Sequence, residues 1–363
     1  MSQTLSVIKA DIGGWVGHTA VHPELLAHTQ AALARAVSDG LVIDAQAHTC
    51  GDDLFLIISH ERGENDEAVH RLAWETFESG AVIAKRLGLH GAGQDLVADA
   101  FTGSVRGAGP GSAELTLEER PSEPVLVFLS DKTAVGAFNL PLYRMFADPF
   151  NTPGLIMSEP LHDGFSFEVH DRKEQRKIVL TTPDEAYGLL GLIGSPGRFA
   201  VKRVISRRTN EVAAVCSIGD GSQLTGRYLG EDDPAAIVRC QGNFPAVGEA
   251  LEPFGTPWLV LGGMRDSHYG PWMPVAEAQA HPSRFDGPAR VVALGFQLHE
   301  GRLGLARDLF EDPAYDRARA EANRMMEYMR MHGPFEPHLA AMDEMERESL
   351  PATAKLATRW TRA

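Results

Sequence analysis

Residues 49–58 have the sequence Thr49-Cys50-Gly51-Asp52-Asp53-Leu54-Phe55-Leu56-Ile57-Ile58. The run over 54–58 is short and continuously apolar, which is typical of a strand that is buried on both faces. A second strand is predicted before it, from Leu41 onward, and the segment around Gly51 breaks the chain between the two. We therefore predict a strand, a break and a strand, with the two carboxylates of Asp52 and Asp53 in the break.

Other segments predict both strands and helices. Pro23 after His22 is typical of a helix start, and Asp39-Gly40 of its end. Two further helices are predicted over about 66–87 and 314–331, and strands over about 5–12, 125–129 and 290–298, from their apolar periodicity. Residues 91–112 are rich in glycine and predict a long loop. Because strands and helices alternate without a regular βαβ repeat, we predict an α+β layered sandwich that forms one domain over residues 1–363.

The composition is that of a globular protein with a strongly acidic surface. The 363 residues are 44% hydrophobic, and 49 Asp and Glu against 34 Lys and Arg give a net charge of −15. This charge repels phosphate backbones and anionic lipid, so nucleic acid and membrane are not expected partners. Three cysteines without Cys-x-x-Cys spacing predict neither a disulfide framework nor a thiolate zinc site. With no apolar signal segment at the N-terminus, we expect a cytoplasmic protein.

Several aspartates follow strand-like or glycine-marked segments, where the loops of a sheet gather. Each one alone is explained by the preference of Asp for turns and helix caps. Adjacent aspartate pairs favour a hard-cation site instead, because packed like charges are costly unless a cation neutralises them. Magnesium is commonly held by a few carboxylates together with substrate phosphates. The candidate carboxylates are Asp11, Asp52, Asp53, Asp131, Asp232 and Asp233.

Other polar residues could complete such a site. Lys132 directly follows Asp131 and could place an ammonium on a phosphate, and Arg265 could clamp an anion. Gln94 offers a carbonyl oxygen, whereas a lone histidine such as His18 is more often a surface or core residue than a metal ligand. We find no phosphate-binding loop, no Gly-x-Ser-x-Gly elbow and no His-Glu-x-x-His motif.

Long ordered blocks of the chain resemble the fructose 1,6-bisphosphate aldolase/phosphatases, the class V fructose bisphosphatases. They include Ser6-Val7-Ile8-Lys9-Ala10-Asp11-Ile12-Gly13, Gly51-Asp52-Asp53-Leu54, Ala92-Gly93-Gln94-Asp95-Leu96, and Met145-Phe146-Ala147-Asp148-Pro149-Phe150-Asn151-Thr152-Pro153-Gly154. The resemblance covers nearly the whole chain. It implies a four-layer α-β-β-α sandwich, a homo-octamer, and an enzyme that uses several Mg²⁺ ions on a sugar phosphate.

The resemblance also implies roles for individual residues. The metal-ligand positions of the family fall on Asp11, His18, Asp52, Asp53, Gln94, Asp131, Asp232 and Asp233. Its sugar-phosphate contacts fall on His18, His90, Gly103, Ser104, Lys132, Gln241, Gly242, Arg265, Asp286 and Arg347.

Three positions depart from the family pattern. Glu231 stands where the family has its Schiff-base lysine, and a carboxylate cannot form an imine with a ketose. Tyr228, the acid/base of the aldolase step in the family, is retained. Arg347 replaces a second tyrosine, and a fixed cation suits a phosphate better than proton transfer. His90 stands where the family usually has tyrosine.

We therefore expect a Mg²⁺-dependent phosphatase that converts fructose 1,6-bisphosphate to fructose 6-phosphate in gluconeogenesis and lacks the Schiff-base aldolase activity. Catalysis is expected to involve Lys132, Tyr228, Glu231 and Asp233. Glu231 is as well explained by binding a metal ion as by shuttling a proton. One alternative is a metal-dependent isomerase, epimerase or aldol enzyme on another phosphosugar, and a further one is a non-catalytic sugar-phosphate-binding protein.

Overall fold

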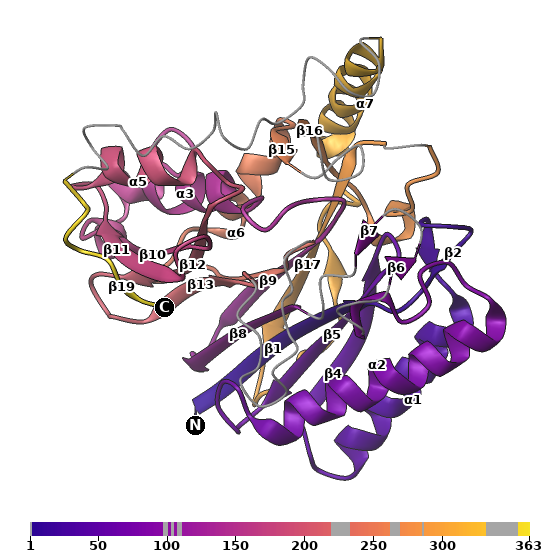
Figure 1. Ribbon diagram of the computed structural model, residues 1–363. Coiled ribbons are helices and arrows are strands. Elements are labelled where there is room, and N and C mark those ends of the chain that lie inside the picture. Colours follow the sequence, from indigo (N-terminus) through magenta and orange to yellow (C-terminus); the bar gives the residue numbers. More distant parts are fainter. Residues whose placement is uncertain are drawn as a thin grey trace.

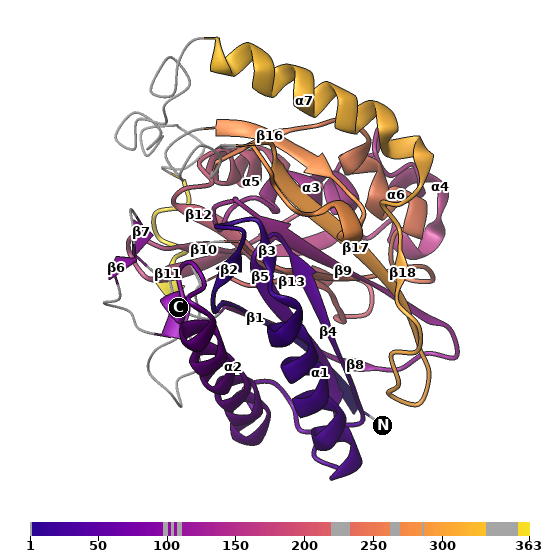
Figure 2. The ribbon, with the colours of Figure 1, turned by 90° about the vertical axis from the view of Figure 1, so that its right-hand side faces the viewer.

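The computed structural model describes residues 2–96, 101–102, 105–106, 111–218, 233–261, 269–284, 287–331 and 355–363. The described chain forms two β-sheets stacked between two layers of helices (Figure 1). Figure 2 shows α1 (Pro23–Ser38) and α2 (Glu67–Leu87) on one side of the molecule and α7 (Asp316–Arg330) on the opposite side. The predicted α-β-β-α sandwich is confirmed.

The smaller sheet has four antiparallel strands that lie under α1 and α2. Its order is β4 (Asp44–Cys50), β5 (Asp53–His60), β1 (Ser2–Asp11) and β8 (Gly111–Glu118). Almost every residue of β1 and β5 is buried, because one face meets the helices and the other meets the second sheet. The continuous apolar run at 54–58 is explained by this burial on both faces.

The larger sheet has eleven strands. Its path is β15 (Leu259–Leu261), β16 (Tyr269–Pro274), β17 (Ala289–Leu298), β9 (Glu123–Asp131), β14 (Ala236–Arg239), β13 (Val212–Cys216), β12 (Phe199–Ser206), β10 (Phe165–Asp171), β11 (Arg176–Thr181) and β19 (Thr361–Arg362), with β18 (Arg307–Asp308) beside β17. Its outer face is covered by α3 (Asn139–Ala147), α4 (Gly154–Met157), α5 (Ala186–Ile193) and α6 (Val247–Leu251), whereas α7 packs against β16. Two short pairs complete the strands, namely β2 (Gly14–Trp15) with β3 (Ala20–Val21) and β6 (Phe101–Thr102) with β7 (Val105–Arg106).

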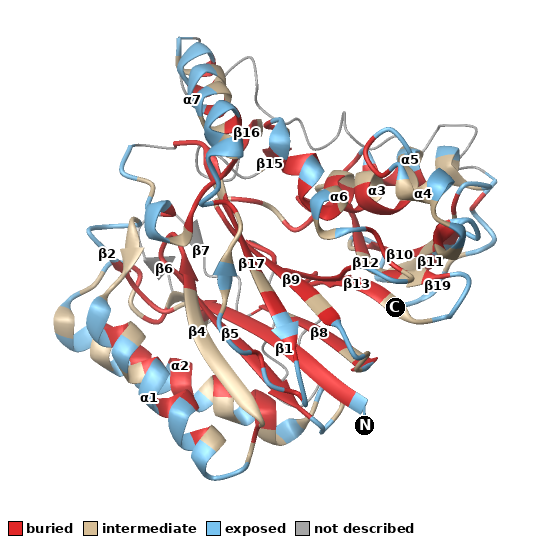
Figure 3. Ribbon diagram, turned by 180° about the vertical axis from the view of Figure 1, so that it is seen from behind, coloured by how far each residue is buried: buried red, intermediate tan, exposed pale blue. Residues whose placement is uncertain are grey.

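Three apolar clusters fill the three interfaces between the four layers. One lies between the small sheet and its helices, one between the two sheets, and one between the large sheet and the outer helices. Figure 3 shows the central strands buried and the outward faces of the helices exposed. The three cysteines, Cys50, Cys216 and Cys240, are buried and free, as their spacing predicted.

The predicted helix boundaries match the capping chemistry. The Asp66 carboxylate accepts hydrogen bonds from the backbone of Ala68 and Val69 at 3.0 and 3.1 Å, and Gly88 ends α2 in the left-handed conformation. The prediction of a continuous loop over 91–112 was incomplete. A short 3-10 helix, η1 (Gln94–Leu96), forms near its start, the strands β6 and β7 pair within it, and β8 begins at Gly111.

No helix in the described part of the chain combines the length and the hydrophobicity that crossing a bilayer requires.

Candidate functional site

Strand ends from both sheets meet at the site. In the small sheet, the antiparallel register of β1 and β5 places Asp11 opposite Asp53. In the large sheet, β9 ends at Asp131, and Asp233 lies just before β14, the neighbour of β9. The backbone N–H of Asp233 donates to the carbonyl of Thr133 at 2.8 Å, and its carboxylate accepts from the Thr133 N–H at 2.7 Å. These contacts hold the 233 carboxylate beside the end of β9.

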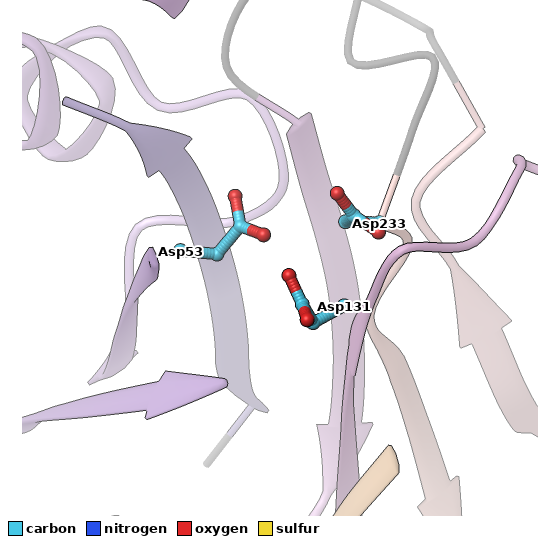
Figure 4. Close-up of side chains that lie close together, drawn as sticks. All are labelled: Asp53, Asp131 and Asp233. Atoms are coloured by element: carbon cyan, nitrogen blue, oxygen red, sulfur yellow. The ribbon is translucent and has the colours of Figure 1, made fainter. Parts of the chain in front are cut away.

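Three carboxylates form the centre of the site, and Figure 4 shows them converging from the two sheets. One oxygen from each of Asp53, Asp131 and Asp233 lies within 4.8 Å of the other two, and all three residues are buried. Buried carboxylates at this separation repel each other strongly. The arrangement is suited to a divalent cation, which favours oxygen ligands.

Glycine makes room for this cluster. Gly51 has φ of 62° at the turn between β4 and β5, and a Cβ atom at this position would overlap the carboxyl group of Asp131. Its N–H donates to the carbonyl of Ala280 at 2.7 Å. The glycine that the sequence places before the first aspartate pair is therefore required both by the turn and by the close approach of Asp131.

A second group of predicted ligands lies around Asp11. Its carboxylate accepts from the backbone of Gly13 at 3.0 Å and from Nε2 of Gln94 at 3.1 Å. Nδ1 of His18 lies 3.7 Å from Oδ2 of Asp52. The rings of His18 and His90 pack edge to face, 4.0 Å between centroids.

Lys132 joins the two groups of carboxylates. Its ammonium donates to Oδ1 of Asp52 and to Oδ1 of Asp131, each at 2.9 Å. The residue has φ of 62°, and its side chain remains 32% exposed. Its ammonium therefore binds the buried carboxylates while part of its side chain stays accessible to solvent.

The titration of the aspartates follows from burial and from charge. Burial is the main cause that raises the pKa of Asp131 to about 7; Lys132 opposes the rise, and the neighbouring carboxylates of Asp52 and Asp53 add to it. For Asp52, burial alone would raise the pKa, but Lys132 and His18 outweigh it and hold the pKa well below its usual range. Burial, followed by repulsion from Asp52 and Asp53, raises the pKa of Asp11.

Two buried carboxylate oxygens indicate whether the site fits a metal ion. Oδ2 of Asp131 and Oδ2 of Asp52 accept no hydrogen bond within the described residues, although both atoms are shielded from solvent. Buried acceptors without a donor are costly unless a cation or a water satisfies them. Carboxylates, a Gln amide and a His imidazole form a donor set that suits a hard or borderline divalent cation. The residues present therefore fit a Mg²⁺-type centre.

Two predicted substrate contacts lie far from this centre within one chain. The N–H of Cys240, next to Gln241, donates to the carbonyl of Pro124 at 3.0 Å. Pro124 is near the start of β9, whereas Asp131 ends the same strand, about 23 Å away on the usual rise per residue of a β-strand. Gln241 and Gly242 therefore do not join the carboxylates of their own chain.

The described residues include all the predicted metal ligands except one. The predicted positions that lie outside them are Gly103, Ser104, Tyr228, Glu231, Asp232, Arg265, Asp286 and Arg347.

Sequence reasoning missed two charged residues behind the cluster. Lys9 and Asp95 are buried next to Asp53 and Asp11. Lys9 lies two residues before Asp11 on a predicted strand, so both side chains are on the same face. That spacing was a usable signal, but a lysine in an apolar strand gives no indication of which carboxylate it pairs with.

Comparison with known proteins places this geometry in a family. The fructose-1,6-bisphosphatase family model matches residues 2–361. The chain belongs to the fructose-1,6-bisphosphatase family. Its members are phosphoric monoester hydrolases, so the resemblance noted in the sequence is confirmed.

Three relatives illustrate the similarity, each named fructose-1,6-bisphosphate aldolase/phosphatase. The protein of Thermococcus kodakarensis is 54% identical over 98% of this chain and 96% of its own length. That of Ignicoccus hospitalis is 53% identical over 96% and 90%, and that of Moorella thermoacetica 52% identical over 99% and 94%.

Proposed function

We propose that this protein is a Mg²⁺-dependent phosphatase that hydrolyses fructose 1,6-bisphosphate to fructose 6-phosphate and phosphate, without a Schiff-base aldolase activity. The observation that carries the proposal is the buried triad of Asp53, Asp131 and Asp233 with Lys132 beside it. Phosphate-ester hydrolysis depends mainly on positioning and charge neutralisation, and this group of residues supplies both.

The carboxylates would hold the cations. Asp53, Asp131 and Asp233 supply oxygen ligands from the two sheets, and the second group extends the site through Asp11, Asp52, Gln94 and His18. Bound Mg²⁺ would neutralise charge on the phosphoryl group and make water a better nucleophile.

Lys132 would bind the phosphoryl group. In the free protein its ammonium is held by Asp52 and Asp131, and these carboxylates raise its pKa although burial opposes the rise. The lysine therefore stays protonated at neutral pH. With cations bound at those carboxylates, the ammonium would be free to donate to a phosphate oxygen and stabilise the developing charge.

The test is phosphate release from fructose 1,6-bisphosphate with and without Mg²⁺, measured from pH 5.5 to 8.5. We expect release only with Mg²⁺, and the Mg²⁺ concentration for half-maximal rate should fall as the pH rises through about 7. The reason is that Asp131 must lose its proton before it binds a cation, and its pKa in the metal-free protein is about 7. No release from any sugar bisphosphate would overturn the proposal.

The loss of aldolase activity is proposed from Glu231 alone. Borohydride should trap no ketose on the wild-type chain, because no lysine stands at that position to form the imine. Glu231→Lys should become trappable without recovering a normal aldol rate, because Arg347 still replaces the second tyrosine of the family. A normal aldol rate in the Glu231→Lys variant would contradict this interpretation of Arg347.

The proposal includes a homo-oligomer, by family resemblance an octamer. Its support is the distance between Gln241 and the carboxylate triad within one chain. If Gln241 and Gly242 contact a sugar phosphate, they do so at the site of another copy. A cytoplasmic location, a role in gluconeogenesis and the absence of nucleic-acid and membrane partners remain predictions of the sequence.

A further inference from the structure

Lys9 is a buried cation behind the carboxylate triad. It lies in β1, and its side chain is 2% exposed. Val7 and Leu5, two and four residues earlier on the same face of the strand, belong to the apolar cluster between the two sheets. The lysine therefore extends from the end of an apolar interface, where an ammonium is costly unless carboxylates compensate it.

Among the residues that the structure describes, the carboxylates of Asp53 and Asp95 face this ammonium. Nζ of Lys9 donates to Oδ1 of Asp53 at 3.1 Å and lies 3.8 Å from Oδ2 of Asp95. The same Oδ2 of Asp95 accepts the backbone N–H of Asp11 at 2.9 Å. Lys9 thus contacts one member of the triad directly and is linked through Asp95 to the end of β1.

Lys9 and Lys132 occupy different positions relative to solvent. The side chain of Lys132 is 32% exposed, whereas Lys9 is enclosed between the sheets. A ligand that enters from solvent can displace Lys132 from its carboxylates, but Lys9 has no exposed position to move to. Its charge stays next to Asp53 whether or not the site holds cations.

We propose that Lys9 is a permanent internal counter-cation of the metal centre, which lowers the affinity of the carboxylate cluster for divalent cations. This inference rests on the proposed cation site but not on the identity of the substrate. The cluster contains six described carboxylates, those of Asp11, Asp52, Asp53, Asp95, Asp131 and Asp233. A fixed positive charge among them reduces the repulsion between the carboxylates in the metal-free protein. It also weakens cation binding, so that bound cations can exchange.

The sign of the effect follows from Coulomb's law. An ammonium and a divalent cation that share the Asp53 carboxylate repel each other, and the buried site screens this repulsion weakly. Lys9→Met keeps the length of the side chain and removes the charge, so divalent cations should bind more tightly. Asp95→Asn removes a negative charge and should weaken binding. The double variant restores the net charge and should bind like the wild type.

The experiment is a titration of the full-length protein with Mn²⁺, followed by electron paramagnetic resonance of the free ion. We expect the dissociation constant of Lys9→Met to be at least about tenfold lower than that of the wild type. Lys9→Arg keeps the charge and should stay within about threefold. Lys177→Met is the matched control, because Lys177 also pairs with a carboxylate, that of Glu168 at 3.5 Å, but on β11 and with a side chain that is 37% exposed. It should bind Mn²⁺ like the wild type.

Thermal unfolding gives a second measurement. Metal-free Lys9→Met should unfold at a lower temperature than the wild type. Saturating Mn²⁺ should raise the melting temperature of Lys9→Met by more degrees than it raises that of the wild type. If Lys9→Met does not fold, the comparison of Asp95→Asn with the double variant carries the test, since the double variant should bind Mn²⁺ at least about tenfold more tightly.

The outcomes separate this inference from the proposed function. Unchanged or weaker Mn²⁺ binding by Lys9→Met overturns the counter-cation role and leaves the phosphatase proposal in place. Equal affinities for Asp95→Asn and the double variant overturn it as well. If the wild-type protein binds no Mn²⁺, the proposed cation site is wrong, and the proposed function is overturned with it.

Discussion

Asp131→Asn should release phosphate from fructose 1,6-bisphosphate at least about 10³-fold more slowly than the wild type at saturating Mg²⁺. Asp131 is the central carboxylate of the site. It is within reach of the other two members of the triad and accepts a hydrogen bond from Lys132 at 2.9 Å. Asparagine preserves the shape of the side chain but removes the negative charge that the cation requires. The measurement is steady-state phosphate release at pH 8, where wild-type Asp131 is ionised.

The same variant should be more stable than the wild type when no metal is present. Burial raises the pKa of Asp131 to about 7, so the folded wild type holds a proton there that the unfolded chain has already lost. Wild-type stability therefore falls as the pH rises from about 4 to about 7. The asparagine does not titrate, so its advantage in melting temperature should grow over that range and level off above it.

A control separates this effect from the loss of any surface charge. Asp163→Asn changes an exposed aspartate in the loop before β10 and should alter neither activity nor the pH dependence of stability. If Asp131→Asn kept its phosphatase activity, the triad would not be the cation site. If it lost stability at every pH, the interpretation of the buried carboxylate as a source of repulsion would be wrong.

Gly51→Ala should abolish activity and lower the free energy of unfolding by about 3 kcal/mol or more. The left-handed backbone at φ of 62° disfavours any Cβ, and at this position the Cβ would also overlap the Asp131 carboxyl group. Either the turn between β4 and β5 opens or Asp131 moves out of the triad. Urea unfolding and phosphate release measure the two consequences.

Gly40→Ala is the matched control. Gly40 has φ of 70°, and nothing lies within 4 Å of the position that its Cβ would occupy. The substitution should cost about 1 kcal/mol, from the backbone conformation alone, and leave activity unchanged. Equal effects of the two substitutions would show that the close approach of Asp131 to Gly51 does not matter.

Much of the site could be predicted from local sequence. Asp11, Asp53 and Asp131 each follow a strand-like or glycine-marked segment, which placed them where loops gather, and adjacent carboxylates indicated a cation site. The helix over about 66–87 was predicted from its apolar periodicity, and the structure caps it with Asp66 and Gly88. β8 was not predicted, because Glu114 interrupts its apolar pattern. In the structure the Glu114 carboxylate is buried and satisfied by the hydroxyl of Ser6 at 2.6 Å and the N–H of Asn65 at 2.7 Å.

The amino-acid sequence alone determined the strands and helices with a clear period, the carboxylates at strand ends and the family. These properties depend on neighbouring residues and on matched blocks, which need no three-dimensional coordinates. The pairing of Lys9 with Asp53, the close approach of Asp131 to Gly51 and the separation of Gln241 from the triad required the tertiary structure. They depend on sheet register and on the stacking of two sheets, which bring together residues that are distant in the chain.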